Sequence, residues 1–257
     1  MRVLVTGGNT VVPIDKVRCI SNMFRGRTGA NIALEACRRG HHVHFLASDP
    51  NILKPEITSA LPPECWKLER YRTFDDLHEA MQRVIEKDTV DVVIHSAAVS
   101  DYRVEGIFAP DTDTHFCLES RTWESREGMP TRMVARSAGK IKSNEPELWL
   151  RMVQNPKLID LIRPSWRFSG ILVKFKLEVG VDEQELLEIA ERSREHSAAD
   201  LVVANTLLGL TFIGPVNGRY ERMKSRRELA SKLLDAVESL AAERKAAQSP
   251  PLAENMP

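Results

Sequence analysis

The chain has 257 residues, enough for one α/β domain with a full core or at most two small ones. Its 36 basic and 36 acidic residues cancel, so the overall charge gives no indication of a nucleic acid or a membrane surface as partner. No stretch approaches the roughly 20 apolar residues of a membrane helix, and the N-terminal apolar run is too short for a signal peptide. The four cysteines show no C-x-x-C spacing, which is typical of a cytoplasmic protein with free thiols.

The N-terminal segment predicts a buried strand followed by an unusual glycine-rich connection. Residues 2–6 form a short apolar run that ends at Gly7-Gly8. A long polar stretch separates this pair from Gly26-x-x-Gly29 at the start of a predicted helix. The common dinucleotide-binding loop, in contrast, passes directly from strand to helix. The sequence therefore predicts a split loop.

Strands and helices alternate through the rest of the first hundred residues. The predicted elements are a helix over 29–39, a strand over 42–48, a helix opened by the capping box Thr73-x-x-Asp76, and a strand running into a small-residue turn over 90–102. Apolar strands that alternate with amphipathic helices predict a parallel sheet covered on both faces. The turns after residues 6, 48 and 96 then share one rim, at the strand ends where ligands bind in such sheets.

The second half of the chain continues this alternation after a long polar stretch. Residues 103–139 are predicted to be a lid or a protruding hairpin. After it we expect a strand over 147–153 and a helix with Asn155 at its N-cap and Pro156 at its first position. A strand over 170–178, a helix from Asp182 to about 196 and a strand over 199–206 follow. The chain then continues with short strands near 211–213 and 219–223 and a last helix from the capping pair Ser225-x-x-Glu228 to about 244.

These elements together predict an α/β protein with a Rossmann-like, doubly wound, mostly parallel sheet and helices on both faces. A loop or hairpin insertion over 103–139 would protrude from it. One nucleotide-binding domain is expected over 1–245, followed by a disordered tail over 246–257.

The two glycine groups are candidates for phosphate binding. Glycines let backbone amides come close to phosphate oxygens, and a helix start offers unpaired N–H groups and the positive end of a helix dipole. The polar stretch between the groups would bring Arg18, Asn22 and Arg25 beside a bound polyphosphate. The alternative is that the glycines form turns and bind nothing.

The turn Ser96–Asp101 is predicted to lie at the same rim. Its small residues allow a ligand to approach closely, and Asp101 is suited to a ribose, a metal or a cation, or to capping the turn. In the segment Lys174-Phe175-Lys176 the two lysines share one face of the strand. Two ammonium groups in a buried strand are costly unless they reach the exposed end or an anion, and a surface position is the simpler interpretation.

Several segments together resemble the phosphopantothenoylcysteine synthetase family, which acts in the second step from pantothenate toward coenzyme A. The segment "GGNTVVPIDKVRCISNMFRGRTG" is similar to the family's opening motif, and "SAAVSDY" to its A-A-V-A/S-D-Y/F motif. "GKIKS", "LRMVQNPKLI", "VKFKLE" and "ADLVVANTL" follow in family order, so the resemblance runs from residue 3 to about 240. Phe24-Arg25 replaces the family's Ser-Ser, and the stretch between Asp101 and Lys140 is longer than its flap.

The resemblance implies a ligase that forms an amide bond between 4′-phosphopantothenate and L-cysteine. The carboxylate would be activated as an acyl-nucleotide by CTP or ATP with Mg²⁺, and the choice of nucleotide and the metal ligands stay open. Asn22 would hold the acyl intermediate, and Lys140 would stabilise charge during its turnover. The implied nucleotide-binding residues are Gly7, Gly8, Ser96, Ala97, Ala98, Asp101, Phe175, Ala204 and Asn205, and the implied substrate-binding residues are Arg18, Arg25 and Gly26. Family members are homodimers in which a loop of one subunit completes the other's site, so a homodimer is expected here.

Two other functions remain open at this stage. An NAD(P)-dependent oxidoreductase would use Asp49 for a ribose, but a tight G-x-G-x-x-G is missing. The pair Tyr220-x-x-x-Lys224 resembles that of short-chain dehydrogenases but lacks the serine of a triad. A non-catalytic nucleotide-binding relative is also consistent with Phe24-Arg25.

Overall fold

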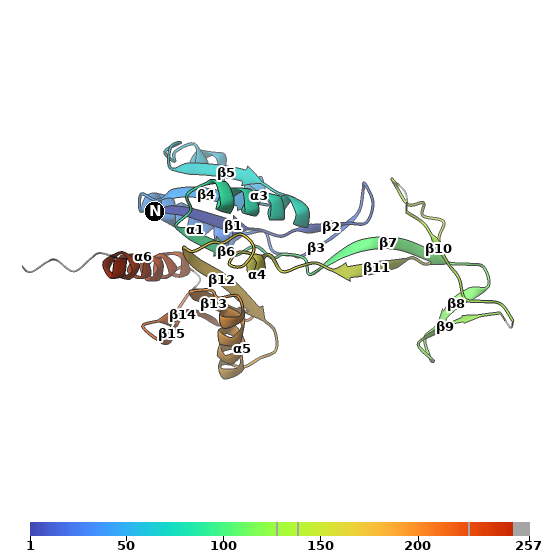
Figure 1. Cartoon of the computed structure of the whole chain (residues 1–257). Coiled ribbons are helices and arrows are strands. Elements are labelled where there is room, and N and C mark those ends of the chain that lie inside the picture. The colour runs from blue at the N-terminus through green and yellow to red at the C-terminus, as the bar shows by residue number, and fades with distance from the viewer. Residues whose placement is uncertain (127, 138, 226, 249–257) are drawn as a thin grey trace, which may run out of the picture.

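The computed structural model describes residues 1–126, 128–137, 139–225 and 227–248, without the side chains of Pro50 and Gln248. Its centre is an eight-stranded sheet (Figure 1). Six strands are parallel: β13 (Leu201–Thr206), β12 (Ile171–Glu178), β6 (Val92–His95), β1 (Arg2–Gly7), β4 (His42–Ala47) and β5 (Trp66–Arg70), in that spatial order. Beside β13, β14 (Thr211–Val216) and then β15 (Arg219–Arg222) extend the sheet antiparallel. The order reverses between β1 and β6, which confirms the predicted doubly wound, Rossmann-like sheet.

Helices cover both faces of this sheet. One face carries α1 (Arg27–Arg38) and α6 (Leu229–Gln248), and the other carries α3 (Phe74–Lys87), α4 (Leu158–Leu161) and α5 (Glu183–His196). Strand side chains alternate between the two cores: Val3 and Val5 pack with α1 and α6, whereas Leu4 packs with α3. The short helices η1 (Pro50–Ile52) and α2 (Pro55–Thr58) connect β4 to β5.

Capping residues fix several helix starts as predicted. Thr73 and Asp76 form a reciprocal capping box at α3, and the Asp182 side chain accepts a hydrogen bond from the Glu185 N–H at α5. Asn155 is an exception, because its side chain donates to the Ser100 carbonyl and its backbone N–H donates to the Asp101 carbonyl. The predicted N-cap at Asn155 is therefore wrong, and α4 begins at Leu158.

The last helix extends further than expected. It continues to Gln248, past the predicted end near 244 and into the segment expected to be disordered. The rest of that segment, 249–257, lies outside the described residues. None of the helices in the described ranges combines the length and the apolarity needed to cross a membrane.

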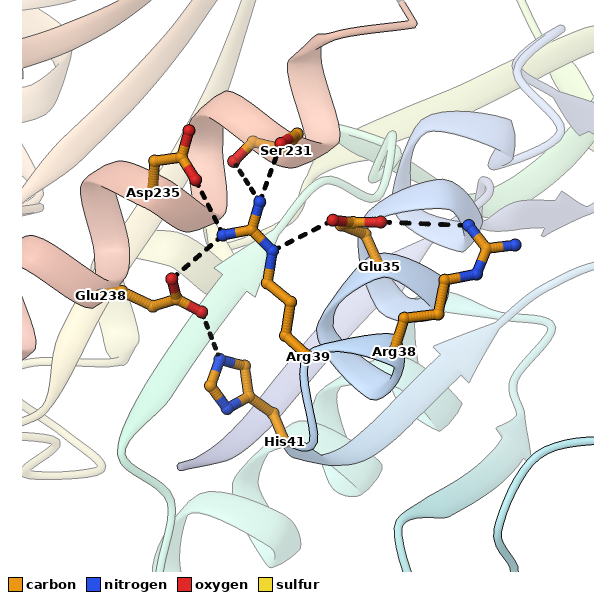
Figure 2. Close-up of polar contacts among 7 residues, drawn as sticks. All are labelled: Glu35, Arg38, Arg39, His41, Ser231, Asp235 and Glu238. Atoms are coloured by element: carbon orange, nitrogen blue, oxygen red, sulfur yellow. Dashed lines mark hydrogen bonds and ion pairs between the residues drawn. The ribbon is translucent and has the colours of Figure 1, made fainter.

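A network of charged side chains joins α6 to the end of α1 (Figure 2). The Arg39 guanidinium donates to Glu35 at 3.0 Å, to Asp235 at 2.8 Å and to Glu238 at 3.0 Å. His41 contacts the other oxygen of Glu238 at 2.9 Å. The C-terminal helix is thus fixed against the end of α1 by several bonds to one guanidinium.

The segment between the two glycine groups forms a small hairpin. It consists of β2 (Val11–Pro13) and β3 (Cys19–Ser21), which pair antiparallel. Bridges from Asn9 to Ala98 and from Val11 to Thr73 attach its base to the rim. The hairpin therefore projects from the carboxyl edge of the sheet, between β1 and α1.

The predicted insertion is a long antiparallel arm, here defined as residues 102–154, which projects away from the sheet (Figure 1). Its shaft consists of β7 (Tyr102–Pro110) paired with β11 (Trp149–Gln154), and β10 (Met133–Ala135) adds a third strand. A second hairpin, β8 (Thr114–Cys117) and β9 (Thr122–Ser125), lies toward its end. The expected protrusion is thus present, and it also includes the strand predicted over 147–153.

Candidate functional site

A cavity of about 450 Å³, here called cavity A, opens at the carboxyl ends of the strands. It lies where the strand order reverses, the position at which doubly wound sheets bind their ligands. It brings together most of the residues predicted for nucleotide and phosphate binding, namely Gly8, Arg25, Gly26, Ser96, Ala97, Ala98, Phe175 and Asn205.

The two glycine groups, distant in sequence, meet directly in space. A Cβ on Gly26, where φ is +89°, would lie 2.4 Å from the Gly8 nitrogen. One on Gly29 would lie 2.9 Å from the Gly7 Cα atom, and one on Gly8, at φ +102°, would lie 2.0 Å from the Ser48 hydroxyl. The hairpin is therefore inserted without separating the strand end from the helix start, and the tight turn of a phosphate-binding loop is re-formed.

The start of α1 offers free donors to this cavity. The first bond of the helix runs from the Ala30 N–H to the Gly26 carbonyl at 3.0 Å. The N–H groups of Arg27, Thr28 and Gly29, all of which line cavity A, belong to the first turn and have no intrahelical acceptor. The exposed Arg25 side chain has no hydrogen-bond or ion-pair partner among the described residues. This arrangement of amides, helix dipole and guanidinium suits a polyphosphate.

A second cavity of about 390 Å³, here called cavity B, adjoins cavity A. Asn22 and Asp101 line cavity B rather than cavity A, and the Asn22 amide donates to the Ala98 carbonyl at 3.2 Å. The wall common to both cavities consists of Phe24, Ala97, Ala98, Phe175 and Leu177. Two ligands bound side by side would therefore meet at this wall.

Two buried basic residues line cavity B. His95 and Lys174 are register partners on β6 and β12, so their side chains share a sheet face. The Lys174 ammonium donates to the Ser193 carbonyl at 2.7 Å and to the Ser197 hydroxyl at 2.6 Å. Burial lowers the pKa of Lys174 to about 8. Burial, together with the charge of Lys174, lowers the pKa of His95 to about 4.

Neither residue was predicted to lie at the functional site. His95 received no role there, and Lys174 was expected to be at the surface, whereas it is only 6% exposed. The sequence signal that could have pointed to them was a histidine in one apolar strand and a lysine in another. Only the register of β6 and β12 shows that they are side by side.

Arg18 and Lys140 lie together at a third cavity, separate from cavities A and B. They line a cavity of about 660 Å³, here called cavity C, with Lys142 and Asn144. Arg18 forms an ion pair of 2.7 Å with Asp15 and donates to the Ile141 carbonyl at 3.1 Å, which fastens the hairpin tip to this segment. Hydrogen bonding to Arg18 holds the pKa of Asp15 well below its usual range. Within one chain, Lys140 therefore lies in a different cavity from Asn22.

Two further predicted residues have side chains directed elsewhere. Ala204 is fully buried and packs with Leu186 and Phe212 beneath α5, so only its backbone is able to meet a ligand. Gly7 does not line cavity A, and a Cβ there would lie 3.0 Å from the Phe45 ring. Its role in the structure is close packing beside the glycine turn.

The described residues build no obvious metal site. They contain no group of three or more His, Cys, Asp or Glu side chains placed to hold a metal ion. The residues that line cavity A include no carboxylate. Any Mg²⁺ in this cavity would therefore be held mainly by phosphate oxygens and water, which is its usual mode with nucleotides.

Comparison with known proteins identifies relatives of this chain by sequence. Residues 1–110 match the family model described as the DNA/pantothenate metabolism flavoprotein C-terminal domain. The chain is 30% identical to the coenzyme A biosynthesis bifunctional protein CoaBC of Thermococcus kodakarensis over 249 residues, 93% of this chain and 51% of the relative. It is 26% identical to phosphopantothenate–cysteine ligase 1 of Arabidopsis thaliana over 227 residues, 80% of this chain and 69% of the relative.

A solved structure supports the same relationship. The DNA/pantothenate metabolism flavoprotein from Streptococcus pneumoniae superposes with a TM-score of 0.72 at 27% identity, covering 93% of this chain and 99% of that one. The chain spans about half the length of the bifunctional relatives that it matches. Its first 110 residues match the model of the DNA/pantothenate metabolism flavoprotein C-terminal domain, and these relatives confirm the resemblance to phosphopantothenoylcysteine synthetase.

Proposed function

We propose that the chain is a phosphopantothenate–cysteine ligase that activates the carboxylate of 4′-phosphopantothenate as an acyl-nucleotide. The observation that carries this proposal is the junction of cavities A and B. Cavity A offers helix amides and a free guanidinium for a polyphosphate, and cavity B places the Asn22 amide directly beside it. The name of the Arabidopsis relative supports the same reaction class, and that of the Thermococcus relative supports a place in coenzyme A biosynthesis.

In this proposal the nucleoside triphosphate occupies cavity A. Its phosphates lie against the N–H groups of Arg27, Thr28 and Gly29, and Arg25 neutralises part of their charge. The base lies toward Phe175 and Asn205, at the ends of β12 and β13. Mg²⁺ carried by the phosphates would neutralise charge on the leaving pyrophosphate. CTP and ATP are both candidates.

The chain's own residues contribute mainly positioning and electrostatic stabilisation. The substrate carboxylate attacks the α-phosphorus, pyrophosphate leaves, and the cysteine amine then displaces the nucleotide from the acyl carbon. Asn22 is suited to hold the acyl group, since its amide is anchored to the turn that forms the wall between the cavities. Polar groups fixed in advance in this way lower the barrier without rearranging during the reaction.

A homodimer is part of the proposal, because one chain does not bring all the predicted residues together. Arg18 and Lys140 line cavity C, apart from cavities A and B. Arg18 lies in the tip of the β2–β3 hairpin and Lys140 lies within the arm, and both of these projections are suited to reach a second copy. Lys140 and Arg18 of one subunit would then serve the acyl-nucleotide of the other.

The test is pyrophosphate release by the purified chain with 4′-phosphopantothenate, L-cysteine and either CTP or ATP. We expect turnover that needs the acid substrate, and loss of turnover in Asn22→Asp and Lys140→Gln with an unchanged circular dichroism spectrum. Normal turnover by either variant would refute its assigned role. Nucleotide binding without pyrophosphate release would favour the non-catalytic alternative.

The oxidoreductase alternative finds little support in the geometry. The Tyr220 hydroxyl donates to Glu191, and Tyr220 lines neither cavity A nor cavity B. The Asp49 carboxylate accepts a hydrogen bond from the Asn51 N–H, as the N-cap of η1. Failure of NADH and NADPH to show enhanced fluorescence with the protein would complete this exclusion.

A further inference from the structure

A fourth cavity, here called cavity D, takes no part in the reaction steps described above. It has a volume of about 470 Å³ and lies at the carboxyl ends of β4 and β5, where Ser48, Asp49 and Arg72 line it. Residues 21–25, together with Asn9, line its other side. Polar and charged side chains thus surround a space to which no ligand has been assigned.

Two guanidinium groups at cavity D are available to a ligand. Arg25 and Arg72 are both exposed, and neither guanidinium has a hydrogen-bond or ion-pair partner among the described residues. The backbone of Arg72 is nevertheless fixed, because its N–H donates to Asp76 at 3.0 Å and its carbonyl accepts from the Val11 N–H at 2.9 Å. An anion between the two guanidiniums would relieve their mutual repulsion, and their planar shape suits phosphate oxygens.

Hydrogen bonds hold other polar side chains of cavity D in place. The Ser48 hydroxyl accepts from the Asn9 N–H at 3.0 Å and donates to the Asn9 side-chain oxygen at 3.1 Å. The Asn9 amide donates in turn to the Asn22 carbonyl at 2.8 Å. The end of β4 is thereby tied to the hairpin segment, so this wall of the cavity is formed before a ligand binds.

Cavity D continues the line of the proposed nucleotide. Cavity A lies at the ends of β13, β12, β6 and β1, and cavity D follows at the ends of β4 and β5, which come next in the sheet order. The two cavities share residues 23–25. A triphosphate whose base lies toward Phe175 and Asn205, and whose first phosphate lies near Gly8, therefore directs its outer phosphates toward cavity D.

Asp49 contributes a carboxylate to this otherwise cationic lining. Its Oδ1 atom accepts from the Asn51 N–H at 3.0 Å as the N-cap of η1, and its other oxygen has no hydrogen-bond partner in the described part of the chain. A carboxylate opposes a bound anion unless a cation lies between them. Mg²⁺ is commonly bound by one or two carboxylates together with phosphate oxygens. Cavity D thus suits a polyphosphate that carries a Mg²⁺ ion.

We propose that cavity D receives the pyrophosphate produced when the acyl-nucleotide forms. In that step an oxygen of the substrate carboxylate bonds to the α-phosphorus, and the bond from this phosphorus to the bridging oxygen breaks. The bridging oxygen leaves on pyrophosphate with the electron pair of that bond. Arg25 and Arg72 bind the pyrophosphate, and Asp49 meets its Mg²⁺. This assignment rests on the proposed function, and it adds the direction of departure and the roles of Arg72 and Asp49.

Direct calorimetric titration of inorganic pyrophosphate tests this site without turnover. The protein is titrated in the presence of Mg²⁺, CMP and AMP, so that a nucleotide occupies cavity A. We expect Arg72→Gln to weaken pyrophosphate binding about tenfold or more, because a charge-assisted contact is lost, and Arg72→Lys to retain part of the affinity. The matched control is Arg70→Gln, at an exposed position of β5 that does not line cavity D, and it should bind as the wild type does.

A second variant tests the role of the carboxylate. Asp49→Asn keeps a side chain that can cap η1 but removes the negative charge. Addition of Mg²⁺ should increase the affinity of the wild type for pyrophosphate, and this increase should be absent in Asp49→Asn. An equal increase in both proteins would contradict the role of Asp49.

Two results would overturn the inference as a whole. These are equal pyrophosphate affinities of Arg72→Gln and Arg70→Gln, and the absence of saturable pyrophosphate binding to the wild type. A different result would overturn the proposed function alone: pyrophosphate binds as expected, but the chain releases none from CTP or ATP with 4′-phosphopantothenate. Cavity D would then stand as a pyrophosphate site of another reaction.

Discussion

At Gly26 the backbone adopts a conformation and a packing that only glycine fits. Its φ is +89°, and an added Cβ would meet backbone atoms of Gly7 and Gly8 rather than a movable side chain. We expect Gly26→Ala to lower the free energy of unfolding by about 2–4 kcal/mol and to abolish triphosphate binding. Chemical denaturation and nucleotide titration would measure the two effects.

Gly40 provides the matched control. Its φ is +81°, but an added Cβ there would meet no described atom within 4 Å. Gly40→Ala should therefore cost about 1 kcal/mol, from backbone strain alone, and leave nucleotide binding intact. Equal destabilisation by the two substitutions would show that the contact between the glycine groups adds nothing.

The buried His95 predicts a loss of stability on acidification. Its pKa is about 4 in the folded chain and near 6.5 when unfolded, so between these values the unfolded state binds the extra proton. The free energy of unfolding should fall by about 3 kcal/mol from this group as the pH drops from 6.5 to 4. Urea denaturation across this range measures the fall.

Carboxylates also titrate in this pH range and change the stability of any variant. The contribution of His95 is therefore measured as the difference in free energy of unfolding between the wild type and a variant without the histidine. The variant His95→Gln retains an acceptor for the Thr6 hydroxyl but removes the titrating ring. The difference in stability between wild type and variant should shrink toward pH 4. Parallel curves for the two proteins would contradict the assignment of a neutral, buried histidine.

Among the elements, the arm has a small core of its own. The rings of Phe116, Trp123 and Trp149 contact one another, with centroid distances of 4.6–5.2 Å. This cluster joins the β8–β9 hairpin to the shaft strand β11. We expect Trp149→Ala to weaken the arm locally by about 3 kcal/mol, because the cluster loses its common partner.

Limited proteolysis measures that local effect. Cleavage within residues 111–132 should become much faster in Trp149→Ala, whereas the thermal midpoint of the sheet domain should stay the same. Met129→Ala, at an exposed position on the arm, is the control and should change neither quantity. A lowered midpoint without faster cleavage would mean that the arm and the sheet unfold together.

Most elements of the central sheet were predictable because they carry a local signal, whereas β5 was not given as a strand. Apolar runs mark β1 and β13, and capping residues mark α3 and α5. In the arm, β11 was predicted as a strand, but no local signal predicted its pairing with β7, because the two strands lie more than forty residues apart in the sequence. Asn155 was misassigned because its amide bonds to the distant Ser100 carbonyl instead of to a local helix.

At the scale of the whole molecule, the predicted dimer allows a sharp test. If Asn22 and Lys140 act from different subunits, a mixed dimer of Asn22→Asp and Lys140→Gln contains one site with both residues intact. An equal mixture of the two inactive variants, exchanged by mild dissociation, should recover about a quarter of wild-type activity. Sedimentation should give about twice the chain mass of 29.0 kDa.

No recovery in the mixture would place both residues in the same subunit's site. A monomer with full activity would refute the dimer itself. Mixing wild type with either variant, which should only dilute the activity, controls for effects of the exchange procedure.

The residues of the site could be predicted only in part from the sequence, because their grouping into cavities depends on the arrangement of the whole fold. The doubly wound topology brings the turns after β1 and β6 to one rim, and this placed Gly8, Ser96 and Asn205 in one cavity. The partition into three cavities depends on how the hairpin and the arm lie. That also explains why Lys140 is apart from Asn22 in one chain.

The β2–β3 hairpin makes this part of the molecule modular. Because Gly8 and Gly26 touch across its base, residues 9–24 could be exchanged for another sequence of similar reach while the glycine turn and Arg25 are kept. In the proposed ligase, the acyl group that is accepted could then change while the proposed nucleotide site stays the same. An engineer seeking ligases for other carboxylic acids would start by grafting at this junction.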